Sequence, residues 1–331
     1  MQNDIIIVGG GLNGPALALA LAQTGHFVTI IDALSEKVRK NAGFDGRSYA
    51  LALASKRLLD GIGVWPAIDG HAQPMLEIKV TDGRAGEGPS PFFMHFDHAE
   101  IEEGPMGFMV EDRHLRRAFL DALASEPRIT HLSGKTVVAQ DTDANGATVT
   151  LDGGQEITGR VLVGSDGRSS GTATRAGIKR TGWGYEQTAL VCAVAHEKPH
   201  NGIAHQFFMP PGPLAILPLT GNRCSIVWSE TDADAKRINA MSDADYYSGK
   251  ELGQVLGSLL VDLRLFSVCL ARSPRTTGLL TKVEFRDVSR HCIPRRDALG
   301  VPRTGVVQQH PIVEHSGNFH GLGRLEPPLL S

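Results

Sequence analysis

The sequence predicts an α/β fold, in which a parallel sheet covered by helices is joined to a mixed β-sheet. Three observations support this prediction: a strand–helix–strand pattern in the first 32 residues, a third apolar strand at residues 160–164, and period-two β segments between Ala189 and Trp228. A chain of 331 residues is long enough to bury a large core and to form one large domain or two.

The N-terminal pattern predicts a parallel βαβ unit. Residues 4–9 indicate a short buried strand, because Ile5–Val8 are four β-branched residues in a row. Residues 15–24 are rich in alanine and leucine, which favours a helix, and Gly25 is placed to end it. Residues 26–32 form the second strand, so a right-handed crossover connects two parallel strands.

The rest of the chain alternates helical spacing with period-two segments and turn residues. The expected elements are, in order, a helix at 49–59, short strands between 75 and 97, a helix at 112–123, hairpin turns at 145–146 and 152–154, a third buried strand at 160–164, an antiparallel sheet between 189 and 228, and one or two helices at 232–260.

The composition excludes several classes of protein. With 41% hydrophobic and 21% charged residues and a net charge of −3, nothing indicates a nucleic-acid partner. The four cysteines are widely spaced and lack a CxxC pair, which is typical of a reducing compartment and argues against a disulfide framework or a metal site. A basic leader and an apolar run of ~18 residues are both missing, so we expect a cytoplasmic protein.

A glycine-rich turn follows the first strand directly. Gly9, Gly11 and Gly14 form G-x-G-x-x-G at the start of the predicted helix, where they permit a tight turn, close approach of a pyrophosphate and close helix–strand packing. Asp32 ends the second strand 18 residues after Gly14, where it can accept hydrogen bonds from an adenosine ribose. The motif predicts a Rossmann-like unit that binds a dinucleotide, either FAD or NAD.

Further motifs distinguish between these two cofactors. Asp45-Gly-Arg47, Glu111-Asp-Arg113-His-Leu and Gly164-Ser-Asp166-Gly occur in that order after the glycine turn. Together with the stretches at 182–189 and 211–228, they resemble the class A FAD-dependent monooxygenases. Within that class the chain is most similar to the ubiquinone-biosynthesis hydroxylases (2-polyprenyl-6-methoxyphenol hydroxylase-like), over residues 3–260.

The resemblance implies an FAD/NAD(P)-binding domain of the glutathione-reductase type with a mixed β-sheet substrate domain. In that family the residue matching Arg47 contacts the flavin, the residue matching Arg113 helps hold the FAD pyrophosphate, and the aspartate matching Asp166 lies near FAD and the phosphates of the nicotinamide nucleotide. The expected cofactor-binding residues are therefore Gly9, Gly11, Gly14, Asp32, Arg47, Arg113 and Asp166. No catalytic side chain is assigned, because the cofactor carries most of the chemistry.

The same resemblance implies FAD-dependent, NAD(P)H-using hydroxylation of a polyprenyl phenol by molecular oxygen. A polyprenyl substrate also implies peripheral contact with the inner face of the membrane or with a ubiquinone-biosynthesis complex. The implied division places an FAD-binding domain at 1–74 and 98–180, a substrate domain at 75–97 and 181–265, and an altered or disordered segment at 266–331.

The family's third motif, Gly-Asp-Ala followed by His-Pro, is not intact in the last segment. The nearest matches are Asp297-Ala298 and His310-Pro311, which are too far apart. One explanation is a frameshifted or truncated tail, which would leave a catalytically incompetent flavin- or nucleotide-binding remnant. Another is a divergent end that meets FAD differently. A third alternative is an FAD-dependent dehydrogenase that does not activate oxygen.

Overall fold

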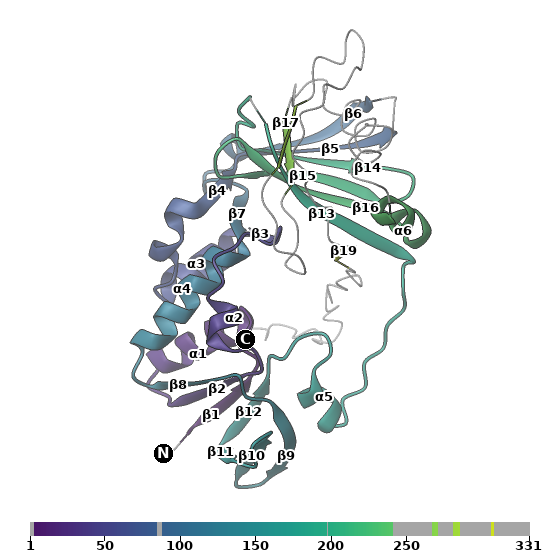
Figure 1. The fold of residues 1–331 in the computed structure, drawn as a ribbon. Helices are drawn as coiled ribbons and strands as arrows, with labels where there is room; N and C mark the ends of the chain where they lie inside the picture. The colour runs from purple at the N-terminus through teal and green to yellow at the C-terminus, as the bar shows by residue number, and fades with distance from the viewer. Residues whose placement is uncertain are drawn as a thin grey trace, which may run out of the picture.

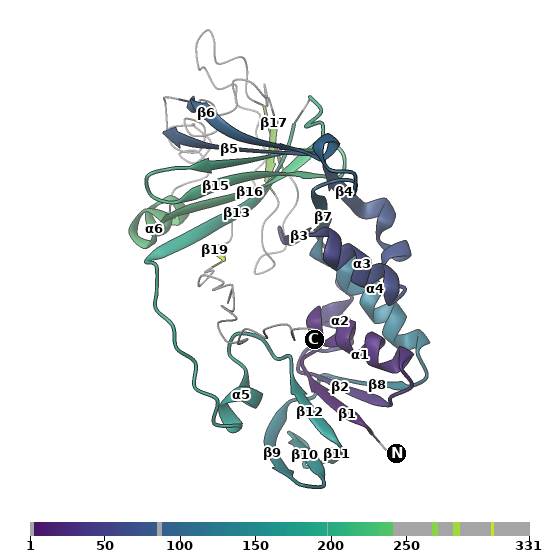
Figure 2. The ribbon, with the colours of Figure 1, turned by 180° about the vertical axis from the view of Figure 1, so that it is seen from behind.

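A computed structural model describes residues 3–84, 88–196 and 198–240, and the backbone of three short strands, β17 (Ser267–Leu270), β18 (Thr281–Glu284) and β19 (Val306–Val307). The parallel sheet that contains the N-terminal strand lies at one end of the molecule in space, and a larger mixed sheet lies at the other end (Figures 1 and 2). The expected third motif lies outside the described residues.

The parallel sheet has four strands in the order β12-β1-β2-β8. Strand β1 (Ile5–Val8) pairs in parallel with β2 (Val28–Asp32) on one side and β12 (Val161–Gly164) on the other, and β8 (Ile129–Ser133) pairs in parallel with β2. Helix α1 (Asn13–Gln23) makes the crossover between β1 and β2. The predicted βαβ unit is confirmed.

Gly25 ends α1 as predicted. Its φ is +92°, its amide donates to the carbonyl of Ala22, and the next amide, of His26, donates to the carbonyl of Leu21. This pair of hydrogen bonds is a Schellman motif, in which a residue without a Cβ adopts the left-handed conformation at no steric cost. The chain therefore turns directly from α1 into β2.

The helix predicted at residues 49–59 is wrong at its first turn. Strand β3 (Ser48–Leu51) occupies that part, and α3 (Leu53–Gly61) begins only afterwards. The cause is tertiary: β3 pairs antiparallel with β7 (Gly107–Glu111), which also pairs with β4 (Ala72–Met75). Local propensity does not include such a pairing partner.

The third strand predicted at 160–164 is present as β12, but it is not buried. Val161 is 52% exposed, because β12 is an edge strand of the four-stranded sheet. The hairpins before it are confirmed: β9 (Val137–Asp143), β10 (Gly146–Leu151) and β11 (Glu156–Gly159) form an antiparallel sheet.

The mixed sheet has seven strands in the order β19-β13-β16-β15-β14-β5-β6. Its further members are β5 (Glu77–Arg84), β6 (Gly88–Asp97), β13 (Gln187–Ala195), β14 (Ile203–Phe208), β15 (Pro213–Leu219) and β16 (Arg223–Thr231). All neighbours pair antiparallel except β14 and β5, which pair in parallel. The predicted α/β fold class with a mixed second sheet is confirmed.

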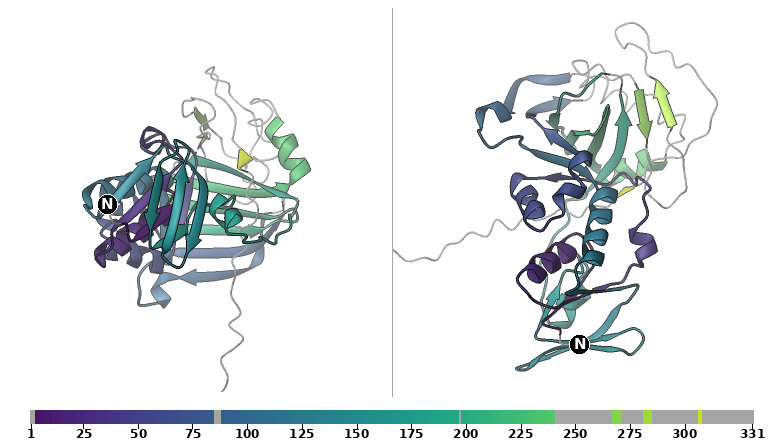
Figure 3. Two further views of the ribbon diagram at one scale, coloured as in Figure 1. Left: turned by 90° about the horizontal axis from the view of Figure 1, so that it is seen from below. Right: turned by 90° about the vertical axis from the view of Figure 1, so that its left-hand side faces the viewer.

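The helices of the described chain pack on different sheets (Figure 3), and α3 contacts β3 and β7 of the separate three-stranded sheet β3-β7-β4. Helix α4 (Asp112–Ser125), predicted at 112–123, packs against α1, and both contribute to a core with β1 and β2. Helix α6 (Asp232–Ala240) packs on β13 and β16, and it is the described part of the helices predicted at 232–260. Shorter helices are α2 (Glu36–Arg39) and α5 (Gly171–Arg175), with 3₁₀ turns at 65–67, 69–71 and 98–100. Among the described residues, no helix is long and apolar enough to cross a bilayer.

Candidate functional site

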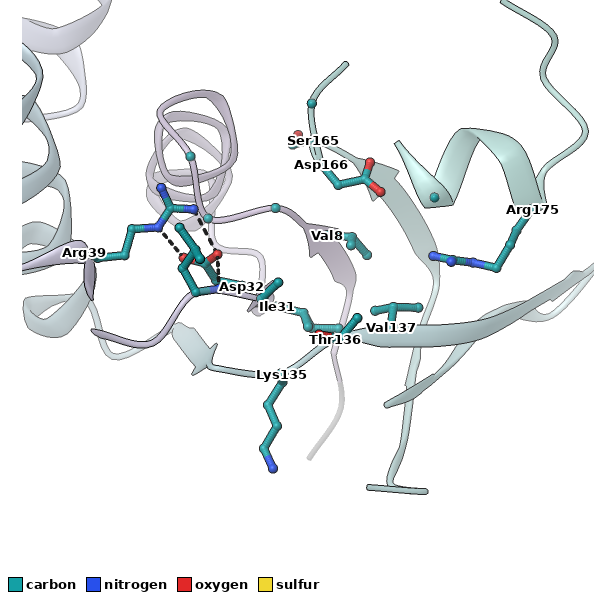
Figure 4. A pocket seen from close by; sticks show the side chains of 17 residues that line it. Val8, Ile31, Asp32, Arg39, Lys135, Thr136, Val137, Ser165, Asp166 and Arg175 are labelled. Carbon is teal, nitrogen blue, oxygen red and sulfur yellow. Dashed lines mark hydrogen bonds and ion pairs between the residues drawn. The ribbon is translucent and has the colours of Figure 1, made fainter. Parts of the chain in front are cut away.

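A cavity of about 410 Å³ opens at the carboxyl ends of β1, β2 and β12 (Figure 4). It lies where neighbouring strands extend to both sides of β1, which is where ligands bind in open parallel sheets. Its lining comes from the turn after β1, the end of β2 and the loop between β12 and α5. The lining residues used below are Gly9, Gly10, Gly11, Asp32, Arg39 and Asp166.

The glycines of the turn serve different purposes. A Cβ on Gly9, whose φ is +117°, would lie 2.2 Å from the carbonyl oxygen of Ser165, and one on Gly14 would lie 1.9 Å from the carbonyl oxygen of Gly9. These two positions therefore need glycine for the turn itself. A Cβ on Gly11 would meet nothing within 4 Å, so protein packing does not explain a glycine there.

Asp32 is buried at the cavity wall and is held by Arg39. The Nε of Arg39 donates to Oδ2 of Asp32 at 2.7 Å and its Nη2 donates to Oδ1 at 2.9 Å, while the amide of Leu34 donates to Oδ1 at 3.1 Å. A carboxylate oxygen accepts about two hydrogen bonds. Oδ1 is therefore saturated, and Oδ2 keeps one free acceptor position.

Gly10, the variable position of the motif, also depends on Asp32. A Cβ on Gly10 would lie 2.3 Å from Oδ2 of Asp32. Because Arg39 fixes this carboxylate by two parallel hydrogen bonds, the side chain cannot easily move aside. The close approach of the turn to Asp32 thus explains a glycine that the motif leaves unspecified.

Asp166 lines the cavity, but its carboxylate bonds within its own loop. Oδ2 accepts hydrogen bonds from the amide and the hydroxyl of Thr172, both at 3.0 Å, and Oδ1 accepts from the hydroxyl of Ser170. Burial tends to raise the pKa of Asp166, but these hydrogen bonds outweigh it and lower the pKa below its ordinary value. The carboxylate thus shapes the loop that leads from β12 into α5.

Arg47 lies in a separate polar cluster beside the cavity. Its guanidinium donates to Asp45 at 2.5 and 2.9 Å and pairs with Asp112 at 3.0 Å. Tyr49 donates its hydroxyl to the same Asp112, at 3.0 Å. Burial, followed by the negative charge of Asp112 and this hydrogen bond, raises the pKa of Tyr49 to about 12.

Arg113 contributes to a second cluster, centred on Glu111. Glu111 is 2% exposed and accepts a hydrogen bond from Nε of Arg113 at 2.7 Å and another from Arg223 of β16. Both guanidinium groups also lie over the ring of Phe44, at 5.5 and 5.7 Å from its centroid. This cluster joins the three-stranded sheet of β3, β7 and β4 to the mixed sheet, since Glu111 ends β7 and Arg223 begins β16.

Arg116 connects the clusters to the cavity. It is 9% exposed, donates to Asp112 at 2.5 Å and donates to the main-chain carbonyl of Arg39 at 2.8 Å. Of the predicted residues, Gly9, Gly11, Asp32 and Asp166 line one cavity, Gly14 supports its turn, and Arg47 and Arg113 lie in the adjoining clusters.

Sequence reasoning missed three residues of this region. Arg39 and Arg116 are basic residues that belong to no recognised motif. Arg39 is nevertheless only seven positions after Asp32, at the last position of α2. Arg175 of α5 points toward the cavity in Figure 4, and its Nε donates to Gln140 at 3.1 Å. The only sequence feature that could have indicated Arg175 is its position, as a basic residue, shortly after the turn at Asp166.

The residues of the cavity fit the ADP half of a dinucleotide. Leu12, at the N-cap of α1, has no side-chain acceptor for the first helical amides, which leaves them to a phosphate. Gly11 adds open space beside them, and Asp32 offers one acceptor oxygen for a ribose hydroxyl. These observations agree with the dinucleotide site predicted from the glycine motif.

A model of a protein family, described as FAD binding domain, matches residues 2–249. Among curated proteins, the ubiquinone hydroxylase UbiL of Rhodospirillum rubrum is 47% identical over 227 residues, which are 69% of this chain and 52% of that protein. The 3-demethoxyubiquinol 3-hydroxylase of Escherichia coli is 32% identical over 243 residues, which are 73% of this chain and 61% of that protein. The chain thus spans little more than half the length of these relatives.

Solved structures share the fold. PqsL of Pseudomonas aeruginosa, crystallised with 2-aminobenzoylacetate, has a TM-score of 0.64 and 21% identity, over 78% of this chain and 71% of that chain. A single-substitution variant of HpxO from Klebsiella pneumoniae, complexed with FAD, has a TM-score of 0.57 and 18% identity, over 70% of this chain and 57% of that chain. The sequence-based expectation of FAD as the dinucleotide is confirmed at the level of the family. The chain belongs to the FAD binding domain family, and its sequence is similar to the ubiquinone-biosynthesis hydroxylases within it.

Proposed function

We propose that this protein is an FAD-dependent, NAD(P)H-using hydroxylase of ubiquinone biosynthesis that acts on a polyprenyl phenol. The observation that carries the proposal is the 47% identity to a ubiquinone hydroxylase over 227 residues, which are 69% of this chain. FAD, once reduced by NAD(P)H, supplies the reaction of oxygen with an electron-rich aromatic ring. The protein's task is to bind the cofactor, orient the ring and exclude water.

The cavity residues are assigned to the ADP half of FAD. The amides that follow Gly9 at the start of α1 would bind the pyrophosphate, Gly11 would leave room for it, and Oδ2 of Asp32 would accept a ribose hydroxyl. Gly14 would keep the helix close to the turn. Asp166 would act through the shape of its loop, because its carboxylate bonds to Ser170 and Thr172.

The arginine clusters are assigned to the neighbouring part of the cofactor. Arg47 and Arg113 keep donors beyond those used by Asp45 and Glu111, since a guanidinium has five N–H groups. Arg47 is half exposed at its side chain, so it can turn toward an anionic group. The clusters lie between the cavity and the mixed sheet, where the flavin ring and the phenol would have to meet.

The apolar face of the mixed sheet is assigned to the substrate. The buried cluster between the mixed sheet and the three-stranded sheet of β3, β7 and β4 includes Met75, Met109, Ala193, Ala204 and Leu219. Arg223, which pairs with Leu219, lies at the edge of this cluster. Such a surface excludes water and suits a phenol that carries a hydrocarbon tail. Catalysis would depend on positioning, and no side chain is assigned a proton-transfer role.

A flavin titration of the full chain tests the proposal first. We expect added FAD to bind with quenching of its fluorescence, and a polyprenyl phenol to stimulate NAD(P)H oxidation and oxygen uptake with formation of a hydroxylated product. A protein that takes up no FAD would contradict the proposal and favour the incompetent remnant. FAD reduction without any phenol-dependent oxygen uptake would favour a dehydrogenase.

A further inference from the structure

One face of the mixed sheet carries two adjacent rows of uncharged side chains that run across six strands. Paired residues of neighbouring strands point to the same face of a sheet. The pairing registers of the strands therefore define a first row of six residues: Val191, Val227, Ala215, Gln206, Val80 and Met94. With strands ~4.8 Å apart, this row is about 24 Å long.

The second row lies beside the first on the same face. It contains Ala193, Ser225 and Leu217 at one end and Ala204, Ile78 and Phe96 at the other. We call the two sets together the apolar rows. Ser225 and Gln206 are their only polar members, and neither is charged.

The second row packs against Met75 of β4 and Met109 of β7, and its members Ala193, Ser225 and Ala204 are at most 3% exposed. Ala193, Ala204, Leu217 and Ile78 pack in one cluster with Phe44, whose ring lies under Arg113 and Arg223. The packed part of the second row is therefore continuous with the arginine clusters assigned above to the cofactor.

The outer end of the apolar rows is exposed on β6. Met94 is 58% exposed and Phe96 is 45% exposed, and Phe92, which alternates with them along the strand, is 85% exposed. Soluble proteins rarely expose neighbouring large apolar side chains without a binding role. On the opposite face of β5 and β6, Lys79 and His95 are paired and both interact with Glu77, and Phe93 is exposed beside them.

We infer that the first row, together with the exposed β6 end of both rows, binds the isoprenoid tail of the substrate. The inference rests on the proposed function and adds the place and direction of the tail. An extended hydrocarbon without hydrogen-bonding groups matches a strip of this length that carries no charge. A bilayer or a second copy of the chain could contact the exposed side chains of β6. Neither would account for the uncharged, half-buried side chains of the first row on the strands from β13 to β5.

The strand β6 supplies its own matched control. Phe93 lies between Phe92 and Met94, is 59% exposed and pairs with Thr81 on the opposite face. Met94→Asp and Phe93→Asp therefore introduce the same charge at neighbouring positions of equal exposure, one on the apolar rows and one behind them. Phe96→Asp is a second variant on the rows.

The test is equilibrium dialysis of the full-length variants against radiolabelled geranylgeraniol, and against 2-methylphenol as a ring without a tail. We expect Met94→Asp and Phe96→Asp to weaken geranylgeraniol binding at least about tenfold, a change of ~1.4 kcal/mol, and to leave 2-methylphenol unaffected. Phe93→Asp should change neither. Equal weakening by Phe93→Asp and Met94→Asp would overturn the inference, as would no weakening by either variant on the rows.

Two further measurements separate the other occupants. Sedimentation with phosphatidylcholine vesicles that lack phenol, and sedimentation velocity in solution, should give the same result for wild type and Met94→Asp. Release from vesicles, or dissociation of a dimer, caused by Met94→Asp alone would assign β6 to a membrane or a second copy and overturn the inference.

Geranylgeraniol binding that is weakened by Met94→Asp but not by Phe93→Asp, in a protein that does not hydroxylate the phenol, would contradict only the proposed function. Hydroxylation of ring phenols without face-specific binding would contradict only this inference.

Discussion

At the scale of single residues, the glycine turn separates requirements of folding from requirements of binding. Gly14 faces the carbonyl oxygen of Gly9 so closely that a methyl group cannot fit, whereas Gly11 faces open space. Gly11 also lacks the positive φ that disfavours other residues. The two positions have the same residue type in the motif but should respond differently to the same substitution.

Gly11→Ala should leave the free energy of unfolding of the FAD-free protein within about 0.5 kcal/mol of wild type and weaken FAD binding by about tenfold or more. The methyl group occupies space that only a ligand would need. Gly14→Ala should destabilise the protein by about 2–4 kcal/mol because of the clash with Gly9. Urea unfolding and flavin titration measure both effects. Destabilisation of the FAD-free protein by Gly11→Ala would contradict this interpretation.

Arg39→Met should destabilise the protein by about 3 kcal/mol, because it leaves the buried carboxylate of Asp32 without its charged partner. The double variant Asp32→Asn/Arg39→Met should be more stable than Arg39→Met alone, because it removes the unpaired charge. A double-mutant cycle based on urea unfolding measures the coupling. Strictly additive effects would show that the two side chains do not stabilise one another.

At the scale of elements, the loop from β12 to α5 depends on one carboxylate. Asp166 accepts three hydrogen bonds from Ser170 and Thr172, and Ser170 in turn caps α5 by accepting from the amide of Ala173. A helix of five residues has little stability by itself. The position of α5 at the cavity therefore follows from these side-chain bonds.

The lowered pKa of Asp166 predicts a pH dependence of stability. Above the ordinary value of 3.8 the carboxylate is ionised in both the folded and the unfolded chain, and its full contribution is present. As the pH falls below 3.8, the unfolded chain takes up the proton first, so the contribution decreases and is lost as pH falls through the folded pKa. The difference in unfolding free energy between wild type and Asp166→Asn, measured by urea unfolding, should shrink in that range. If the difference in unfolding free energy between wild type and Asp166→Asn stayed constant down to pH 2.5, the predicted role of the Asp166 carboxylate would be contradicted.

At the scale of the whole molecule, a buried carboxylate connects the three-stranded sheet of β3, β7 and β4 to the mixed sheet. Glu111 ends β7 and holds Arg113 from the next helix and Arg223 from β16. Since Phe44 lies against both guanidinium groups, polar and apolar contacts occur together at this junction. The junction also adjoins the packed part of the second apolar row, because Phe44 contacts the cluster that contains Ala193 and Ala204.

Glu111→Gln should destabilise the protein by about 3 kcal/mol, because two guanidinium groups lose their shared charged partner. Arg223→Met should cost about 1 kcal/mol, since Glu111 keeps Arg113 and its charge stays paired. Thermal and urea unfolding of the two variants give the comparison. The reverse order of destabilisation would show that the contact across the sheets, and not the paired charge, stabilises the junction.

The local sequence determined the elements that depend on neighbouring residues alone. The βαβ unit, the turn at Gly25 and the hairpins at 145–146 and 152–154 could be predicted because apolar period, chain reversal and left-handed glycine conformations are local properties. The glycine motif and Asp32 were recognisable for the same reason. The fold class followed from the order of these elements.

Only the tertiary structure decided which distant groups meet. The pairing of β3 with β7 replaced a predicted helical turn, and the edge position of β12 exposed a strand expected to be buried. Likewise, the bond from Arg223 to Glu111 and the alignment of the apolar rows depend on sheet order and register. Hydrophobic period specifies which residues prefer burial, but it does not specify the partner, because partners are chosen by packing across the whole chain.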